Sequence, residues 1–125
     1  MSTLKVNNIT DTSGGSSNLS VPGTAKAWVN FNGSGTVAIR DDLNVSSITD
    51  SGTGLYKVNM TSALSNTNYA VTAGTSHLSG SYLATPHLRD RDQVTRSTTQ
   101  FQLDCKNSSG AATDGQEIHV AVFAN

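Results

Sequence analysis

Charge is scarce in this sequence: 8 Lys and Arg stand against 9 Asp and Glu among 125 residues, for a formal net charge of −1. Proteins that hold a phosphate backbone or an anionic membrane do so with clustered Lys and Arg, so we expect neither nucleic acid nor such a surface as partner. The chain also lacks a run of even ten consecutive apolar residues. A transmembrane helix and a secretory signal each need such a run, so we expect a soluble protein that inserts into no membrane.

Cysteine is limited to Cys105, which excludes an intrachain disulfide. Its alternation with Phe101 and Leu103 places it on the inward face of a strand, as a buried structural thiol. A nucleophilic thiolate would need a neighbouring base, and a metal site would need clustered ligands. The three histidines have no spacing that supplies either: His77, His87 and His119. We therefore predict no metal and no cofactor.

What the sequence has in quantity is small polar residues, with 17 Ser, 16 Thr, 11 Asn and 11 Gly. Disordered chains are usually rich in charge and proline, whereas this chain has one glutamate and two prolines. Its Val, Thr, Ile, Tyr and Phe fall in short segments separated by turn residues, which is typical of strands. No stretch shows the apolar spacing of an amphipathic helix.

Period-two alternation predicts seven or so short strands. Asn and Gly residues at 32–35 and a turn at 49–54 predict two hairpins, while Asp41 and Asp42 are expected to break one strand and Gly74 to close another. The predicted strands are 25–31, 36–40, 45–48, 55–60, 69–73, 100–106 and 117–123, and 81–84 is a weaker candidate.

No helical pattern separates these strands, so they favour an antiparallel, jelly-roll-like β-sandwich over residues 25–125, because parallel strands need long crossovers. The predicted core is lean for a monomer, which favours additional contacts between subunits. The residues expected to face inward are Val29, Phe31, Val37, Ile39, Ile48, Tyr56, Val58, Tyr69, Val71, Phe101, Leu103, Ile118, Val120 and Val122.

Residues 1–24 form a separate, extended N-terminal segment in this interpretation. Leu4 and Val6 alternate as one face of a strand, but an isolated strand buries almost nothing and leaves its backbone unpaired. The segment therefore needs a partner, which could be the rest of the chain, a host protein or identical copies around a common axis. A frayed terminus is the alternative. The tract at 13–17 is a flexible joint, and Pro22-Gly23 marks the entry to the next element.

The stretch AKAWVNFNGSGTVAIRDDLNVSSITDSGTGLYKVNMTSALSNTNYAV resembles a module of tail-fibre and related virion proteins of bacteriophages, many from cyanobacterial and other aquatic hosts. The opening STLKVNNI and the closing VAVF are also similar to the ends of such modules. The resemblance covers residues 25–71 and both termini, and residues 74–116 match no known pattern.

This resemblance implies a structural or host-binding part of a virion, usually a homotrimer without a cofactor. The short segment before the globular part favours a short fibre, a tip or a decoration on the tail or neck over a long fibre. Partners would then be other tail or neck proteins, attached through the N-terminal segment, and a host surface glycan or protein.

A physical argument that does not depend on the resemblance also favours a trimer, because sparse apolar residues can be buried against copies of themselves. Leu4, Val6 and Ile9 would then point to the axis. Trp28 lies opposite the inward face of its strand, so we expect it at a subunit interface, where a large aromatic side chain gains most from desolvation. A ligand platform is the alternative for Trp28.

The most unusual region is 77–96, which contains Arg89-Asp90-Arg91-Asp92. Loops on a rigid scaffold often carry recognition, and here the candidate receptor-binding residues are Tyr82, His87, Arg89 and Arg91. The alternative is a solvated turn in which opposite charges pair with little energetic consequence.

Catalysis is not expected. Glu117 is the only glutamate, the aspartates cluster at turns, and no pair of carboxylates is placed for acid and base chemistry. The sequence thus leaves three hypotheses: a host-binding fibre protein, a purely structural decoration or collar protein, and a polysaccharide-degrading fibre tip.

Overall fold

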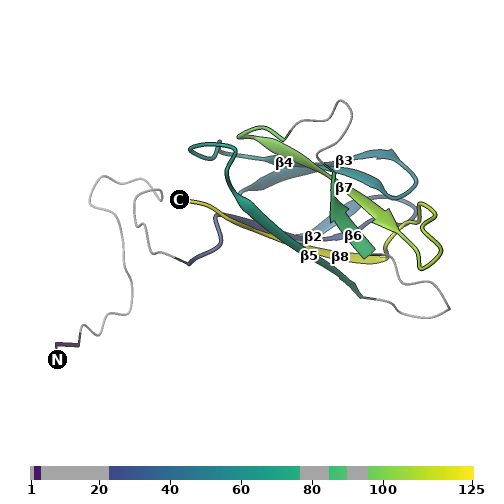
Figure 1. Ribbon diagram of the computed structural model, residues 1–125, viewed down its shortest axis with the longest axis horizontal. Coiled ribbons are helices and arrows are strands. Elements are labelled where there is room, and N and C mark those ends of the chain that lie inside the picture. The colour runs from purple at the N-terminus through teal and green to yellow at the C-terminus, as the bar shows by residue number, and fades with distance from the viewer. Residues whose placement is uncertain (1, 4–22, 77–84, 90–95) are drawn as a thin grey trace.

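The computed structural model describes residues 2–3, 23–76, 85–89 and 96–125 (Figure 1). Strands are its only regular elements in these ranges, and no helix there is long and apolar enough to cross a membrane. The eight strands are β1 (Ala27–Asn32), β2 (Ala38–Leu43), β3 (Val45–Gly52), β4 (Leu55–Met60), β5 (Ala70–Ser76), β6 (Thr85–Leu88), β7 (Gln100–Lys106) and β8 (Glu117–Phe123).

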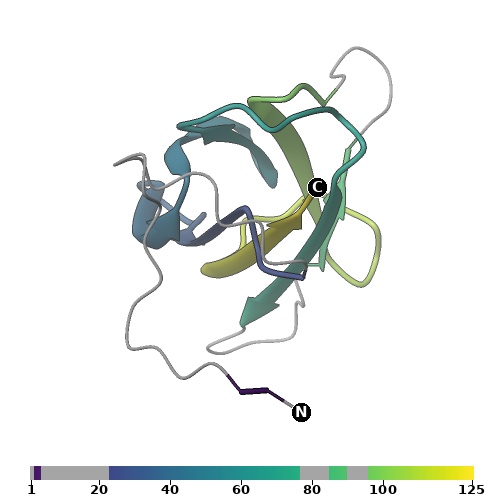
Figure 2. The same ribbon diagram turned by 90° about the vertical axis from the view of Figure 1, so that its left-hand side faces the viewer.

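Two four-stranded sheets pack face to face, with the strand orders β2-β1-β8-β5 and β3-β4-β7-β6 (Figures 1 and 2). We call them sheet A and sheet B. Every pairing is antiparallel, and the first and last strands lie side by side in the middle of sheet A. The all-β, antiparallel β-sandwich predicted from the sequence is confirmed.

The core lies between the two sheets and follows the predicted alternation. Ten of the fourteen residues expected to face inward are buried, and the other four are partly buried against the core: Val37, Ile39, Ile48 and Val71. Cys105 is fully buried, as predicted. Ala27, Val45 and Met60 complete the buried set. At about 25 cal/mol for each Å² of apolar surface removed from water, this interior is the main source of the fold's stability.

Several strand ends differ from the prediction. Asp41 and Asp42 do not break a strand but lie within β2, and β3 continues to Gly52. Gly74 does not close β5, which runs on to Ser76. These strands are edges of their sheets, where exposed polar side chains can remain in water while the backbone pairs on one side.

The chain passes from sheet A to sheet B at Asn44, which has a positive φ of 55°. Its side-chain amide donates to the carbonyls of Lys26 and Ser62, and its Oδ1 accepts the Ser62 amide at 2.8 Å. Asn is among the few residues that adopt the left-handed conformation readily. Asn44 therefore forms the corner that ties the start of β1 to the segment after β4.

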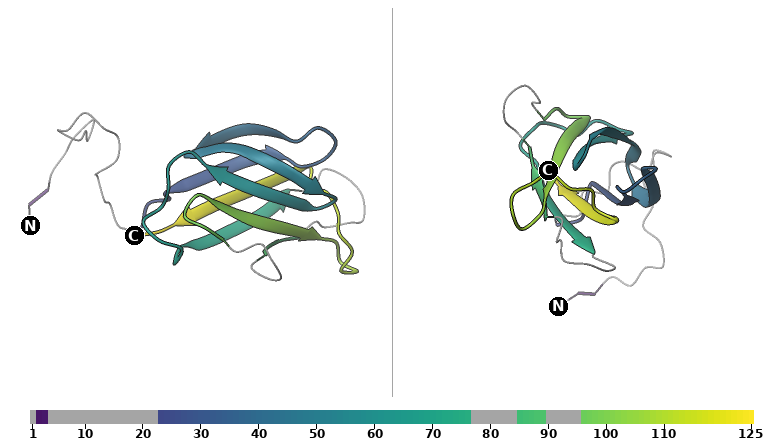
Figure 3. Two further views of the ribbon diagram at one scale, coloured as in Figure 1. Left: turned by 90° about the horizontal axis from the view of Figure 1, so that it is seen from above. Right: turned by 90° about the vertical axis from the view of Figure 1, so that its right-hand side faces the viewer.

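The two ends of the sandwich differ in what they carry. The C-terminus and the start of β1 lie at one end (Figure 3), where the Lys26 amide donates to the Val122 carbonyl. We call it the terminal end. The opposite end, which we call the loop end, holds the β1–β2 turn, the β3–β4 turn and the β7–β8 loop. Two hydrogen bonds join them, from the Gly33 amide to the Gly115 carbonyl and from the Gly54 amide to Asp114 Oδ1.

Tyr56 anchors this loop end from inside the core. Its hydroxyl lies 2.7 Å from the Gly33 carbonyl, to which it donates, and 3.0 Å from Asp114 Oδ1. Burial is the main cause that raises the pKa of Tyr56 far above its ordinary value, and the Asp114 carboxylate adds to the effect. The phenol therefore stays protonated and acts as a fixed donor.

The β1–β2 turn is held by its own first residue. The Asn32 amide group donates to the carbonyls of Ser34 and Thr36 at 2.7 and 3.0 Å, and Asn32 Oδ1 accepts the Ser34 amide. Asn and Gly supply such turn conformations, and the hairpin predicted from Asn32 to Gly35 is confirmed.

Candidate functional site

The outer face of sheet A gathers side chains that the core does not use. Trp28 pairs with Leu43 on one side and Ala121 on the other, so these three residues share the outer face. Asn30 pairs with His119 in the next outward row. The face is divided into an apolar part near the terminal end and a polar part near the loop end.

The apolar part consists of Trp28, Leu43, Ala121 and Phe123, and we call it the apolar patch. Leu43 is 47% exposed and Phe123 is 39% exposed, and they are the exposed large hydrophobic residues of the described chain. Trp28 lies half-buried between them on the sheet. Contiguous exposed apolar side chains, unlike scattered ones, are typical of interaction surfaces.

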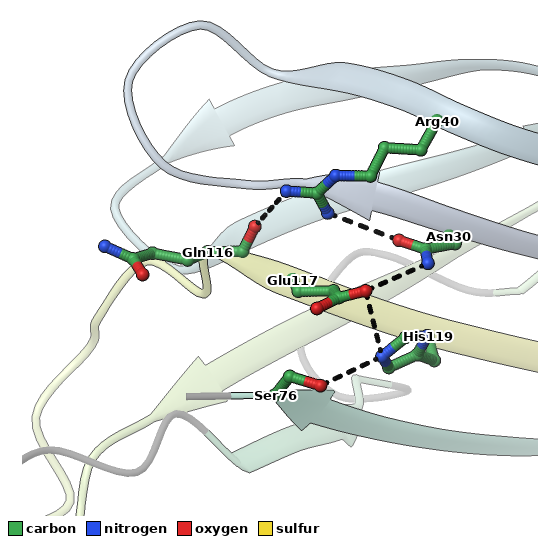
Figure 4. A network of polar contacts seen from close by, with 6 residues as sticks. All are labelled: Asn30, Arg40, Ser76, Gln116, Glu117 and His119. Atoms are coloured by element: carbon green, nitrogen blue, oxygen red, sulfur yellow. Dashed lines mark hydrogen bonds and ion pairs between the residues drawn. The ribbon is translucent and has the colours of Figure 1, made fainter. Parts of the chain in front are cut away.

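The polar part is a row of side chains from all four strands of sheet A (Figure 4). Arg40 donates to Asn30 Oδ1 at 3.3 Å and to the Gln116 carbonyl at 2.9 Å. Asn30 Nδ2 donates to Glu117 Oε1 at 3.1 Å. His119 Nε2 lies 3.6 Å from the same carboxylate oxygen and 3.3 Å from Ser76 Oγ. We call Asn30, Arg40, Ser76, Glu117 and His119 the polar row.

Glu117 is the electrostatic centre of the polar row. The hydrogen bond from Asn30 is the largest of the causes that lower its pKa, and the adjacent His119 and Arg40 lower it further, against a smaller opposing effect of desolvation. A carboxylate that accepts hydrogen bonds and faces positive charge prefers its ionised form. The row thus presents a negative charge whose Oε1 is already engaged by Asn30 and His119.

The geometry of Ser76, His119 and Glu117 differs from that of a nucleophile, base and orienting carboxylate. Such a relay requires the hydroxyl at one ring nitrogen of the histidine and the carboxylate at the other. Here both groups face Nε2. The three residues form a hydrogen-bonded cluster on an exposed face, and this arrangement orients side chains without activating the serine.

No group of three or more His, Cys, Asp or Glu side chains within the described ranges could hold a metal ion. Cys105 lies in the core, and burial, with the nearby Asp104 and Asp114, raises the pKa of its thiol to about 12. Because the thiolate is the reactive form, this cysteine is chemically quiet in the folded protein.

Two of the predicted receptor-binding residues are described. His87 lies within β6, opposite Asp104 of β7, and the Arg89 amide donates to the Gln102 carbonyl just after the strand. His87 therefore belongs to an edge strand and not to a loop. Tyr82 and Arg91 lie outside the described residues, and the role of all four in receptor binding stays a prediction.

Of the predicted subunit-contact residues, Trp28 is described and faces away from the core, as the alternation predicted. Leu4, Val6 and Ile9 lie outside the described residues. The division into residues 1–24 and 25–125 likewise stays a prediction, and the first strand begins at Ala27.

Sequence reasoning did not single out the polar row or the apolar patch beyond Trp28. The outward positions of β1 and β8 were visible in the alternation, but their neighbours across the sheet depend on strand order and register. The register shift between Asn30 and Phe31, which brings Arg40 near Asn30, leaves no local signal in the sequence.

No family model, curated protein or solved structure matches the chain.

Proposed function

We propose that the chain is a bacteriophage virion protein, a tail fibre or short fibre-like appendage, that assembles as a homotrimer and binds the host surface. The virion assignment is supported by the sequence resemblance described above. The trimer is supported by the apolar patch, which is the observation that carries the proposal.

The apolar patch suits contact with identical copies because it occupies one end of a single sheet face. Leu43 and Phe123 remain exposed in the single chain. Burying one large side chain contributes about 1.5–3 kcal/mol, so three copies packed through Trp28, Leu43 and Phe123 would supply the contacts that the lean core lacks.

Light scattering with substitutions in the patch tests the trimer. The full chain should have the mass of three copies at micromolar concentration, and Leu43→Asp with Phe123→Asp should give a folded monomer. Both side chains are exposed in the single chain, so the fold should survive. Ala111→Asp, in the exposed β7–β8 loop, is the matched control and should remain trimeric. A monomeric full chain would rule out the trimer.

Host binding is tested by capture of outer-envelope material from host cells on the purified protein. We expect Arg89→Ala with Arg91→Ala to abolish capture while the fold is unchanged. Lys57→Ala, which removes a positive charge from the middle of sheet B, is the control. Retained capture by the double variant would exclude these arginines from the receptor site.

The alternative is a decoration or neck protein with a purely structural role. It is favoured by the position of His87, which lies in an edge strand opposite Asp104 and not in a loop. This alternative predicts no capture of envelope material by the full chain, together with the same trimer.

A further inference from the structure

Within the described part of the chain, four strands form the edges of the two sheets, and three of them carry features that discourage pairing with another strand. In β2, Arg40, Asp41 and Asp42 place charges on the edge, next to a register shift. Two register shifts interrupt β3. The four-residue β6 contains Pro86. Charges, bulges, proline and short length are the usual protections of a sheet edge.

The fourth edge, β5, has none of these protections. Its sequence AVTAGTS contains no charge and no proline, and its register with β8 is unbroken from Ala70 opposite Phe123 to Ser76 opposite Glu117. It is also seven residues long, against four for β6. A flat, uncharged edge of this length is suited to accept another strand.

The side of the sandwich next to β5 also retains partly buried apolar residues. Val71 and Ala73 of β5 and Leu88 of β6 pack against the core without being fully covered. A strand added at the edge of β5 would extend sheet A over this side.

We propose that the edge of β5 accepts an extended strand from a neighbouring copy of the chain, and that this strand is the segment Leu4–Ile9. The inference rests on the proposed trimer and specifies how its N-terminal segments are held. Leu4 and Val6 alternate as one face of a strand, and β5 supplies the backbone partner that such an isolated strand needs.

The exchange requires residues 10–22 to reach a neighbouring copy. They span at most about 43–47 Å when extended, so the edge of β5 in that copy must lie within this distance of Gly23. The described chain resumes at Gly23, at the terminal end, and β5 begins at the same end, because Ala70 pairs with Phe123.

A neighbouring copy is the chosen source because the described start of the chain lies away from its own β5. Ser2 and Thr3 are exposed and lie apart from the sandwich, as the dark purple trace in Figures 1 and 3 shows. A head-to-tail exchange of this kind closes into a ring when three copies are related by a three-fold axis.

Hydrogen exchange of the full chain tests the proposal. In Leu4→Asp with Val6→Asp, we expect amides of β5 to exchange about tenfold faster or more, because the added strand is lost, while amides of β2 keep their rate. Val21→Asp places the same charge outside the proposed strand and should leave β5 unchanged. Equal β5 rates in the double variant and the wild type would overturn the proposal.

Cross-linking identifies the source of the strand. Val6→Cys and Thr72→Cys are made in separate chains, mixed, refolded together and treated with a flexible bismaleimide; Cys105 is fully buried, and wild-type protein controls for its reaction. A covalent pair of one chain of each kind supports the proposal. A chain that carries both substitutions is treated in the same way. A cross-link that forms only within this chain, and not between the two kinds of chain in the mixture, would overturn the proposal.

The mass of the assembly separates this inference from the proposed function. If the full chain is a trimer and β5 exchange is insensitive to Leu4 and Val6, the trimer stands and the strand exchange is wrong. If the full chain is a monomer by light scattering, both are wrong.

Discussion

At the scale of single residues, Tyr56 links three segments that are far apart in the sequence. Tyr56→Phe removes the hydroxyl and leaves the buried Gly33 carbonyl without its donor. We expect the free energy of unfolding to fall by about 1–2 kcal/mol, measured by urea denaturation. Asp114→Asn, which keeps an acceptor oxygen beside the Gly54 amide, should lower the free energy of unfolding by less. An equal or larger loss than in Tyr56→Phe would mean that Asp114, not Tyr56, is the main anchor of the loop end.

Glu117 is the residue whose charge makes stability depend on pH. Its folded pKa lies below the ordinary value of 4.5, so the ionised carboxylate stabilises the fold above that value, and this contribution is lost as the pH falls through the folded pKa. Wild-type protein should therefore be more stable than Glu117→Gln at neutral pH, and the difference should shrink below about pH 4. Urea denaturation of both proteins between neutral pH and pH values below about 4 measures this difference in the free energy of unfolding. A difference that stays constant with pH would contradict the prediction.

At the scale of the element, the β3–β4 turn depends on Gly54. A Cβ there would lie 2.5 Å from the Cys105 carbonyl oxygen, and its φ is 69°. Gly110 has a similar φ of 82° but open space around it. We expect Gly110→Ala to lower the free energy of unfolding by about 1–2 kcal/mol from backbone strain alone. Gly54→Ala should lower it clearly more, because the β3–β4 turn must also move away from the Cys105 carbonyl of β7. Thermal unfolding of both variants measures the difference, and equal losses would show that the close approach is unimportant.

The strands also show how far the sequence could predict the fold. The four central strands β1, β4, β7 and β8 follow the alternation closely, since both edges of each are paired and one face packs in the core. The edge strands β2, β3 and β5 are longer than predicted, because Asp41 and Gly74 resemble strand breakers but lie where one side of the backbone faces water. The edge strand β6 was not predicted, and the candidate at 81–84 lies outside the described residues. The polar row needed register across four strands, which no local pattern encodes.

At the scale of the whole molecule, the proposed trimer makes stability depend on concentration. If the apolar patch is buried only between copies, dilution favours the dissociated chain, and the midpoint of thermal unfolding should fall with protein concentration. Leu43→Asp with Phe123→Asp should remove this dependence. A midpoint independent of concentration in the wild type would contradict burial of the patch between subunits.

The arrangement of the two ends gives the molecule a direction. The terminal end holds the C-terminus and the start of β1, while the loop end holds three connections bonded to one another. In an appendage attached through its N-terminal segment, the loop end is the one that faces outward.

The turn at Asn32 and Gly33 has a consequence for the chemical lifetime of the protein. In an Asn-Gly pair the glycine nitrogen can attack the side-chain carbonyl carbon of the asparagine and displace ammonia, and water then opens the resulting cyclic imide to aspartate or isoaspartate. Here the Gly33 nitrogen is engaged with the Gly115 carbonyl at 2.9 Å, and the Asn32 amide is bonded to Ser34 and Thr36. The folded chain thereby shields its single Asn-Gly bond, the one most prone to deamidation, from this reaction.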